Sequence, residues 1–301
     1  MKVVICSNLD NGKGLERDYR LLRGLLEGMG HEVRGLHFER DARHPPKNSA
    51  DLLIFLEVCR PAFFGVAPRR WMLPNPEWWN AEDNGHLDAF EAVLCKTRDA
   101  RRLFAPLVGH RAVLTGFLSE DRYLPGQRVR REFLHTPGGS IVKGTKAVLD
   151  AWHRYGIKDR LTVVSTLRPP APRTSYVAWA TRLPEVPYRH HQNGHAFHLC
   201  PSEYEGWGHH LHEGLSVGAC VVTTDAPPMN DVSGVALRIP PAEHGTQRLA
   251  TTARVSPEGV RDAVERCLAL SDAELARIGE EARAAFHDQR EGFAAVLESM
   301  L

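Results

Sequence analysis

Three glutamates and two glycines lie close together in the segment 201–213, PSEYEGWGHHLHE. The residues just before it, 196–200 (AFHLC), are apolar and rich in strand formers. Leu211 and Leu215 follow at helical spacing, and Gly218 ends the run. The pattern predicts a strand, a turn and a helix. A helix start of this kind offers unpaired N–H groups and a positive dipole end to an anion such as phosphate.

Glu205 lies on the predicted turn, and Glu213 lies on the predicted helix eight positions later. Eight residues correspond to about two helical turns. One carboxylate can therefore reach the far end of a ligand whose phosphates cap the helix. The other can reach a pair of hydroxyls nearer the core.

The composition is that of an ordinary soluble globular protein. The chain has 301 residues, of which 43% are hydrophobic and 25% charged, enough for one large or two ordinary α/β domains. A net charge of +1 gives no overall bias toward nucleic acid or a membrane surface. No apolar run approaches the ~20 residues of a membrane-spanning helix, and no signal peptide is expected. Six cysteines without paired spacing favour reduced, buried thiols in the cytoplasm.

Apolar segments alternate with amphipathic ones, which indicates an α/β protein with parallel, doubly wound sheets. In the first half, strands are predicted at 2–6, 32–36, 51–56, 69–75, 91–95 and 112–115, and helices at 15–29 and 97–104. In the second half, strands are predicted at 132–135, 161–166, 186–190 and 196–200, and helices at 145–155, 175–182 and within 256–301. The polar stretch 121–131 is predicted as a linker, and prolines 169, 170 and 172 predict a rigid loop.

The segment from Pro201 to Asp225 resembles the signature of the retaining, nucleotide-sugar-dependent glycosyltransferases of family 4, which have the GT-B fold. That signature is Pro-Ser, Glu-Gly-aromatic-Gly, a second Glu after seven intervening residues, and a Gly-x-x-Val-Val-x-Thr-Asp strand. The chain matches it at 201–202, 205–208, Glu213 and 218–225. The resemblance implies two Rossmann-like parallel-sheet domains facing across a cleft that holds the active site. Residues 1–125 would form the acceptor domain, with helix 285–301 crossing back to it, and 126–284 the donor domain.

The resemblance also implies a role for each matched residue. Glu213 would accept hydrogen bonds from the donor ribose. Glu205 would contact hydroxyls of the donor sugar and stabilise positive charge at its anomeric carbon. Three residues would let the backbone approach the sugar and the diphosphate: Gly206, Trp207 and Gly208. Two residues near strand ends would receive the nucleotide base: Thr166 and Arg189.

A second loop, 136–144 (TPGGSIVKG), resembles the family's small-residue loop and its Lys-Gly pair before a helix. In the family the lysine meets the donor diphosphate, which implies this role for Lys143, with Gly139 and Ser140 lining the loop. The family's arginine, a few residues earlier, is missing here. Lys143 would therefore supply most of the side-chain charge, aided by His209 or His210. The alternative is that Lys143 is a solvated surface lysine.

The first half carries the residues expected on the acceptor side. Glu57 follows a predicted strand, at the end where open α/β sheets place ligands. The family usually has a histidine in the region that here reads PNPEWW, residues 74–79, so Asn75 or Glu77 would take its place. Glu77 is predicted as a catalytic, acceptor-orienting carboxylate. The alternative is a structural turn with both tryptophans in the core.

Two further features leave alternatives open. Gly12 and Gly14, in the loop after the first strand, either approach the donor sugar or the acceptor, or form a simple tight turn. The histidine-rich stretches that include His198 with Cys200, and His209 with His212, raise the possibility of zinc, but no cysteine pair or His-x-x-x-His spacing on one helix accompanies them. There is also no Asp-x-Asp motif. A metal-independent mechanism is therefore expected, in which Lys143 and helix N–H groups neutralise the leaving diphosphate, and no cofactor is expected.

With the resemblance, the sequence predicts a cytoplasmic enzyme of glycan biosynthesis. It would move a sugar from a nucleotide diphosphate sugar to a hydroxyl of a glycan, a lipid-linked acceptor or another molecule, retaining the anomeric configuration. No nucleic-acid partner is expected, and peripheral contact with a membrane is left open. Two rivals keep the nucleotide site: a sugar-nucleotide 2-epimerase on the same fold, and a non-catalytic sugar-nucleotide-binding subunit.

Overall fold

The structure is a computed structural model that describes residues 1–168 and 174–301. The predicted proline loop at 169–172 therefore lies outside the described residues. The chain divides into two compact units. Unit 1 comprises 1–118, 246–250 and 289–301, and unit 2 comprises 119–245 and 251–288. The sequence analysis places the boundary after residue 125, whereas Ser119 and Arg122 hydrogen-bond to residues of unit 2.

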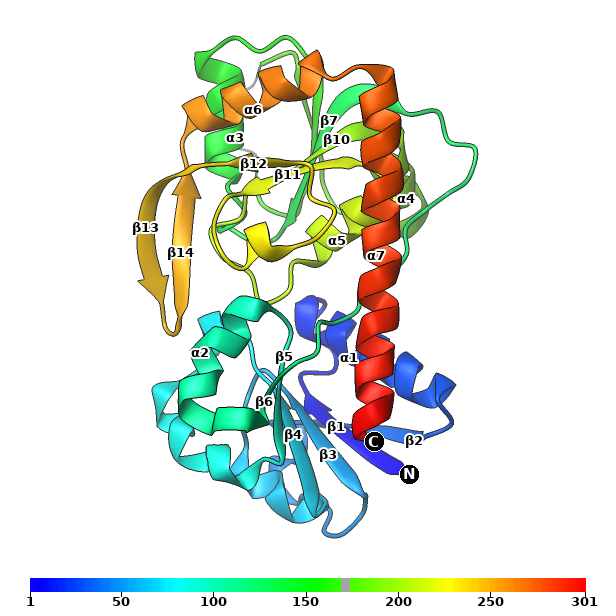
Figure 1. The fold of residues 1–301 in the computed structure, drawn as a ribbon, viewed down its shortest axis with the longest axis vertical. Helices are drawn as coiled ribbons and strands as arrows, with labels where there is room; N and C mark the ends of the chain where they lie inside the picture. The colour runs from blue at the N-terminus through cyan, green and yellow to red at the C-terminus, as the bar shows by residue number, and fades with distance from the viewer. Residues whose placement is uncertain (169–173) are drawn as a thin grey trace. The chain divides into compact units, whose positions relative to one another are not determined.

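Unit 1 is built around a six-stranded sheet of order β2-β1-β3-β4-β5-β6, in which all neighbours pair in parallel. Helix α1 packs beside β1 and β2, and helix α2 packs beside β5 and β6 (Figure 1). The sequence LLIFL of β3 is buried throughout, as expected for a parallel strand covered on both faces. The strands are β1 (Lys2–Ser7), β2 (Glu32–His37), β3 (Leu52–Leu56), β4 (Arg69–Leu73), β5 (Ala92–Cys95) and β6 (Ala112–Leu114), and the α-helices are α1 (Gly14–Gly28) and α2 (Arg98–Val108). Short 3₁₀ helices lie at Arg40–Arg43 (η1), Pro61–Val66 (η2), Pro76–Trp78 (η3), Ala81–Ala89 (η4) and Gly109–Arg111 (η5).

Unit 2 contains a second six-stranded parallel sheet, of order β12-β11-β10-β7-β8-β9. Strand β10 lies between β7 and β11, so the loops that follow these three strands meet at one edge of the sheet. The strands are β7 (Arg130–Gly138), β8 (Leu161–Ser165), β9 (Val177–Ala180), β10 (His195–Cys200), β11 (Cys220–Thr224) and β12 (Leu237–Ile239). The helices are α3 (Thr145–Arg154), α4 (Glu185–Gly194), α5 (His209–Ser216), η6 (Met229–Asp231) and α6 (Pro257–Ala269).

The prediction for residues 175–190 is wrong, because the strand and the helix are interchanged. Val177–Ala180 forms strand β9 and pairs with β8, and Glu185–Gly194 forms helix α4. The helix starts directly after Pro184, and Pro187 lies in its first turn, where a missing N–H costs nothing. Val177 and Trp179 are of residue types enriched in strands, and pairing with β8 at the sheet edge makes 177–180 a strand.

Two elements contribute residues to both units. The hairpin of β13 (Pro241–Gln247) and β14 (Ala250–Val255) has its tip, 246–250, in unit 1, and the sequence analysis did not foresee it. The last helix, α7 (Asp272–Met300), belongs to unit 1 from Gln289 onward, where Phe293 packs against Phe117 with ring centroids 5.2 Å apart. The expectation that the C-terminal helix packs back on the first sheet's unit is confirmed.

Candidate functional site

The loop after β10 is held from several sides in unit 2. The hydroxyl of Thr223 donates to the carbonyl of Cys200 at 2.9 Å, and that of Thr224 donates to the carbonyl of Ser202 at 2.7 Å. Gly208 then turns the chain with φ +86° into helix α5, a conformation that favours glycine. The predicted strand, turn and helix are present, and side chains of β11 fix the turn.

The loop after β7 is drawn against this turn by a second glycine. Gly144 has φ +70°, and a Cβ atom built there would lie 2.2 Å from the carbonyl oxygen of Pro201. Only glycine fits this contact. The N–H of Glu203 also donates to the carbonyl of Val142 at 2.8 Å. The Lys-Gly pair of the sequence therefore brings Lys143 beside the loop that carries Glu205.

Lys143 and Glu205 form an ion pair. The Nζ atom of Lys143 donates to Oε1 of Glu205, and both side chains are largely buried, at 18% and 9% exposed. The Nδ1 atom of His210 lies 3.8 Å from the same oxygen. The structure thus brings together one cation and one carboxylate, from two loops, next to the start of α5. Lys143 is not a solvated surface lysine, so that alternative is wrong.

His210 cannot add positive charge to this cluster at neutral pH. Burial, and to a lesser extent the charge of Lys143, hold the pKa of the His210 imidazole well below its usual value. The Nε2 atom of His210 is hydrogen-bonded to Ser202 at 3.3 Å, and Nδ1 of His209 to Ser119 at 2.9 Å. The expected aid of His209 or His210 to the diphosphate stays a prediction.

The side chain of Trp207 packs inside unit 2. Its ring stacks on His212 with centroids 3.9 Å apart and planes 12° from parallel. Its indole N–H donates to the hydroxyl of Ser119 at 3.0 Å. Ser119 therefore joins Trp207 and His209, and the loop is held in one conformation by a residue that the sequence analysis did not single out.

Glu213 has no exposed surface. Its Oε2 accepts a hydrogen bond from the amide of Gln192 at 2.9 Å, and its Oε1 lies 3.7 Å from Nε of Arg122. Glu213 thereby joins α4, α5 and the segment around Arg122. The expected hydrogen bonds of Glu213 with the donor ribose stay a prediction.

The other predicted donor residues lie along the same edge of the sheet, with one exception. The N–H of Thr166 donates to the carbonyl of Gly138 at 2.9 Å, and a Cβ atom built on Gly139 would lie 2.8 Å from the Thr166 hydroxyl, so the loops that follow β7 and β8 touch. Ser140 lies in the first of these loops. Arg189 lies inside helix α4, where its guanidinium donates to the carbonyls of residues 121, 122 and 123. The strand-end argument for Arg189 is therefore wrong.

The histidines that raised the question of zinc have other partners. Nε2 of His198 is hydrogen-bonded to the carbonyl of Gln192 at 2.9 Å, and Nδ1 of His212 to that of Gly208 at 3.1 Å. Within residues 1–168 and 174–301, no group of three or more histidine, cysteine, aspartate or glutamate side chains is placed to hold a metal ion.

A second polar cluster lies in unit 1, at the carboxyl ends of its strands. Glu57 follows β3, Asn75 follows β4, and Lys96 follows β5. Nζ of Lys96 donates to Oδ2 of Asp18 at 2.6 Å and to Oδ1 of Asn75 at 3.1 Å, and the Asn75 amide donates to Oε2 of Glu57 at 2.7 Å. The sequence analysis found Glu57 and Asn75 but missed Lys96 and Asp18, whose charges are hidden in segments that read as a strand end and a helix.

The remaining predicted residues of unit 1 are placed less favourably. Glu77 is buried in η3, so it does not present its carboxylate to an acceptor as predicted. Of the two tryptophans, Trp79 is in the core and Trp78 is 46% exposed. Gly12 lies two positions before α1, where its N–H donates to the Glu16 carboxylate at 2.8 Å, and Gly14 is the first residue of that helix. Gly12 has φ +64°, which favours a tight turn, and the expected contact of both glycines with the donor sugar or the acceptor stays a prediction.

Replacing Lys96 by methionine is expected to lower the free energy of unfolding by about 3–5 kcal/mol, because Asp18 would keep a buried charge without this partner. Removing both charges, in Lys96→Met with Asp18→Asn, should recover a large part of that loss. Urea unfolding of the wild type and both variants measures the effect. Equal loss in the single and double variants would contradict the interpretation of a compensated charge pair.

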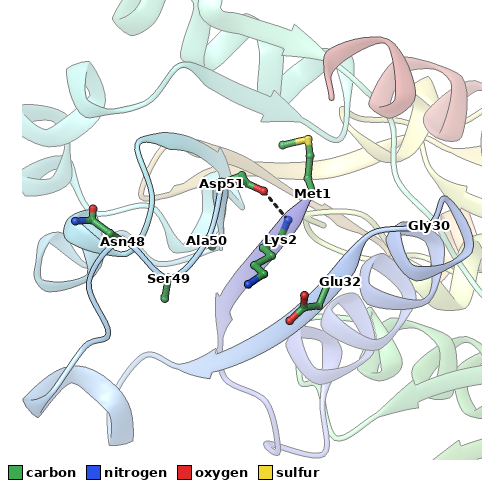
Figure 2. A pocket seen from close by; sticks show the side chains of 8 residues that line it. All are labelled: Met1, Lys2, Gly30, Glu32, Asn48, Ser49, Ala50 and Asp51. Atoms are coloured by element: carbon green, nitrogen blue, oxygen red, sulfur yellow. Dashed lines mark hydrogen bonds between the residues drawn. The ribbon is translucent and has the colours of Figure 1, made fainter.

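A shallow depression of unit 1 lies at the opposite ends of its strands. It has a volume of about 630 Å³ and is lined by Met1, Lys2, Gly30, Glu32 and residues 48–51 (Figure 2). The N–H of Lys2 donates to the Asp51 carboxylate across it at 2.7 Å. Ligands of open α/β sheets bind at the carboxyl ends of the strands, so we assign this depression no function.

Among the described helices, none is both long and apolar enough to cross a membrane.

No protein-family model matches the chain, and no curated protein matches it. Solved structures do. A glycosyltransferase from Rickettsia africae ESF-5 superposes with a TM-score of 0.74 at 10% identity, over 99% of this chain and 97% of that one. Sucrose-phosphate synthase from Thermosynechococcus elongatus gives a TM-score of 0.73 at 12% identity, over 100% and 98% of the two chains.

A third similar structure is Anabaena HepE in complex with UDP-glucose, with a TM-score of 0.68 at 13% identity, over 100% of this chain and 99% of that one. Identities this low establish the architecture and not the activity. The two six-stranded parallel sheets with flanking helices match that architecture. The chain therefore has the GT-B fold, which it shares with these glycosyltransferases.

Proposed function

We propose that the protein transfers a sugar from a nucleotide diphosphate sugar to an acceptor hydroxyl, with retention of the anomeric configuration. The observation that carries the proposal is the convergence of Lys143 and Glu205 beside the first turn of α5. The structure of HepE with UDP-glucose, at full coverage of both chains, supports the same class of donor. A cytoplasmic, metal-independent enzyme remains our expectation.

The proposed chemistry uses charges that the fold already holds in place. Lys143 and backbone N–H groups at the start of α5 would bind the diphosphate and stabilise it as it leaves. Glu205 would accept hydrogen bonds from the donor sugar and stabilise positive charge at its anomeric carbon. Glu213, which lies against Arg122 and Gln192 in this structure, would accept hydrogen bonds from the donor ribose, as the resemblance implies.

A thermal-shift screen with UDP, GDP, dTDP, CMP and their sugars tests the proposal. A nucleotide that binds only the folded state at 100 times its Kd should stabilise the protein by about 2.7 kcal/mol and raise its Tm. One base is expected to stand out, and its nucleotide sugar should release free nucleotide on incubation. A screen in which no nucleotide shifts the Tm would contradict the proposal.

Analysis of the products separates the proposed transfer from its two rivals. An epimerase would release nucleotide and an altered sugar without any acceptor. A binding subunit would show the thermal shift with no release of nucleotide. Transfer predicts a new glycoside whose formation depends on a second hydroxyl compound.

A further inference from the structure

The amide of Asn75 is oriented by its two neighbours in unit 1. Lys96 has only donors to offer, so the atom of Asn75 that it contacts at 3.1 Å is the carbonyl oxygen. The amide nitrogen of Asn75 must then face Glu57, to which it donates at 2.7 Å. Lys96 is itself anchored by Asp18 at 2.6 Å and lies 4.6 Å from the centre of the Phe117 ring. This chain of contacts holds the Oε2 atom of Glu57 in place.

The other carboxylate oxygen of Glu57 is open. In the part of the chain that the structure describes, Oε1 receives no hydrogen bond, and it is not among the buried atoms that lack a partner. Glu57 also has φ +65°, a conformation that costs energy in a non-glycine residue and is typical of functional sites. Its N–H donates to the carbonyl of Leu73 at 2.8 Å, so the backbone is fixed as well. One oxygen is bound, and the other is presented at the carboxyl edge of the sheet.

The surroundings of Glu57 set its charge. Burial raises the pKa of the Glu57 carboxyl above its usual range, while the Asn75 hydrogen bond and the charge of Lys96 act in the opposite direction. Asp18 from α1 raises the pKa further, and Arg248 from the hairpin tip lowers it. When ionised, the open oxygen is therefore a strong hydrogen-bond acceptor. The carboxyl takes up a proton at a higher pH than an ordinary glutamate does.

An exposed aromatic ring lies on the same loop as Asn75. Trp78 is 46% exposed, and the Arg248 guanidinium lies 5.6 Å from its ring centre. An exposed indole three positions from the residue that holds Glu57 suits a sugar ring, which presents apolar C–H groups on its faces and hydroxyls at its edge. The arrangement favours a carbohydrate over a simple alcohol.

From this geometry we infer that Oε1 of Glu57 binds the reacting hydroxyl of a carbohydrate acceptor, and that Asn75, Lys96 and Asp18 are positioning residues for it. The inference rests on the proposed function, because only a sugar-transferring enzyme needs an acceptor. It assigns to Glu57 the role that the sequence analysis gave to Glu77.

Variants of Glu57 test the inference without disturbing the buried pair of Lys96 and Asp18. The wild type, Glu57→Gln and Glu57→Asp are compared with Glu82→Gln, an exposed glutamate of the same unit. Nucleotide release is measured from the nucleotide sugar that gives the largest thermal shift, with methyl α-glucoside, maltose and glucose 6-phosphate as acceptors, between pH 5 and 9. The donor-induced thermal shift is recorded for every variant.

Glu57→Gln is expected to lower kcat/KM for the acceptor by about 10- to 100-fold, as loss of a hydrogen bond to a charged group does. In the wild type the rate should fall at acid pH, because Glu57 becomes protonated. Glu57→Gln should remove this fall and leave the donor-induced thermal shift unchanged. Glu57→Asp should be faster than Glu57→Gln and should again lose rate at acid pH. Glu82→Gln should behave as the wild type.

Three results would overturn the inference while the proposed function stands. The first is a kcat/KM for the acceptor in Glu57→Gln that stays within twofold of the wild-type value. The second is the loss of the donor-induced thermal shift in Glu57→Gln. The third is a wild type that hydrolyses the donor but glycosylates none of the three sugars. A wild type that neither binds nor cleaves any nucleotide sugar would end both proposals together.

Discussion

Replacing Lys143 by alanine is expected to reduce nucleotide release from the donor by at least about 100-fold, as loss of one preorganised electrostatic contact does in other enzymes. Lys143 is the cation that the fold holds against Glu205, so its loss removes the charge that would balance the diphosphate. The thermal shift caused by the donor should disappear in the same variant. Steady-state release of nucleotide and a thermal-shift titration measure the two effects.

Lys146 provides a matched control for this experiment. It lies three positions further along the chain, in the first turn of α3, with its side chain 85% exposed and paired with Asp150 at 2.6 Å. Lys146→Ala removes the same charge from the same region and should leave both rate and donor shift close to those of the wild type. An unchanged donor affinity in Lys143→Ala would contradict the proposed role, and equal losses in both variants would point to a diffuse charge effect.

Lowering the pH from 7 to 5 is expected to destabilise unit 2 by several kcal/mol, because histidines are buried there in the neutral form. Burial lowers the pKa of four imidazoles: to about 4 for His135 and His195, and to about 3 for His198 and His212. His210 is shifted in the same direction. In the unfolded chain each of them would titrate near 6.5.

The sign follows from the protons bound in each state. Between pH 6.5 and about 4, the unfolded chain binds a proton at each of these histidines and the folded chain does not. The contribution of these neutral histidines to the free energy of unfolding is therefore fully present above pH 6.5. It falls as the pH drops toward their folded-state pKa values. Each histidine contributes about 2 kcal/mol between pH 7 and 5, so the four together contribute about 8 kcal/mol, which lies within the 5–15 kcal/mol stability of a typical domain.

Urea unfolding at pH 7, 6 and 5 measures this dependence. His198→Gln should reduce its slope by about 1.4 kcal/mol per pH unit, the contribution of one proton, whatever the variant does to stability at pH 7. Equal urea midpoints at pH 7 and 5 would show that the imidazoles are protonated in the folded protein.

Much of the fold follows from local patterns in the sequence. The buried run of β3 and the strand, turn and helix of β10 and α5 lie where apolar periodicity places them. Lys143 and Glu205 meet for a reason that topology supplies. Their loops follow neighbouring parallel strands, β7 and β10, and such strands end at the same edge of a sheet.

The tertiary structure decided the features that depend on partners far away in the chain. Strand β9 has only four residues, and its pairing with β8 decides that they form a strand. Glu213 is closed off by Arg122, 91 positions before it, and Lys96 meets Asp18 across 78 positions. Spacing and propensity report only on residues within a few positions of each other. Burial and ion pairing depend on which segments the sheet order brings together. They therefore decide that Glu77 and Glu213 are buried, whereas Glu57 and Glu205 are partly accessible.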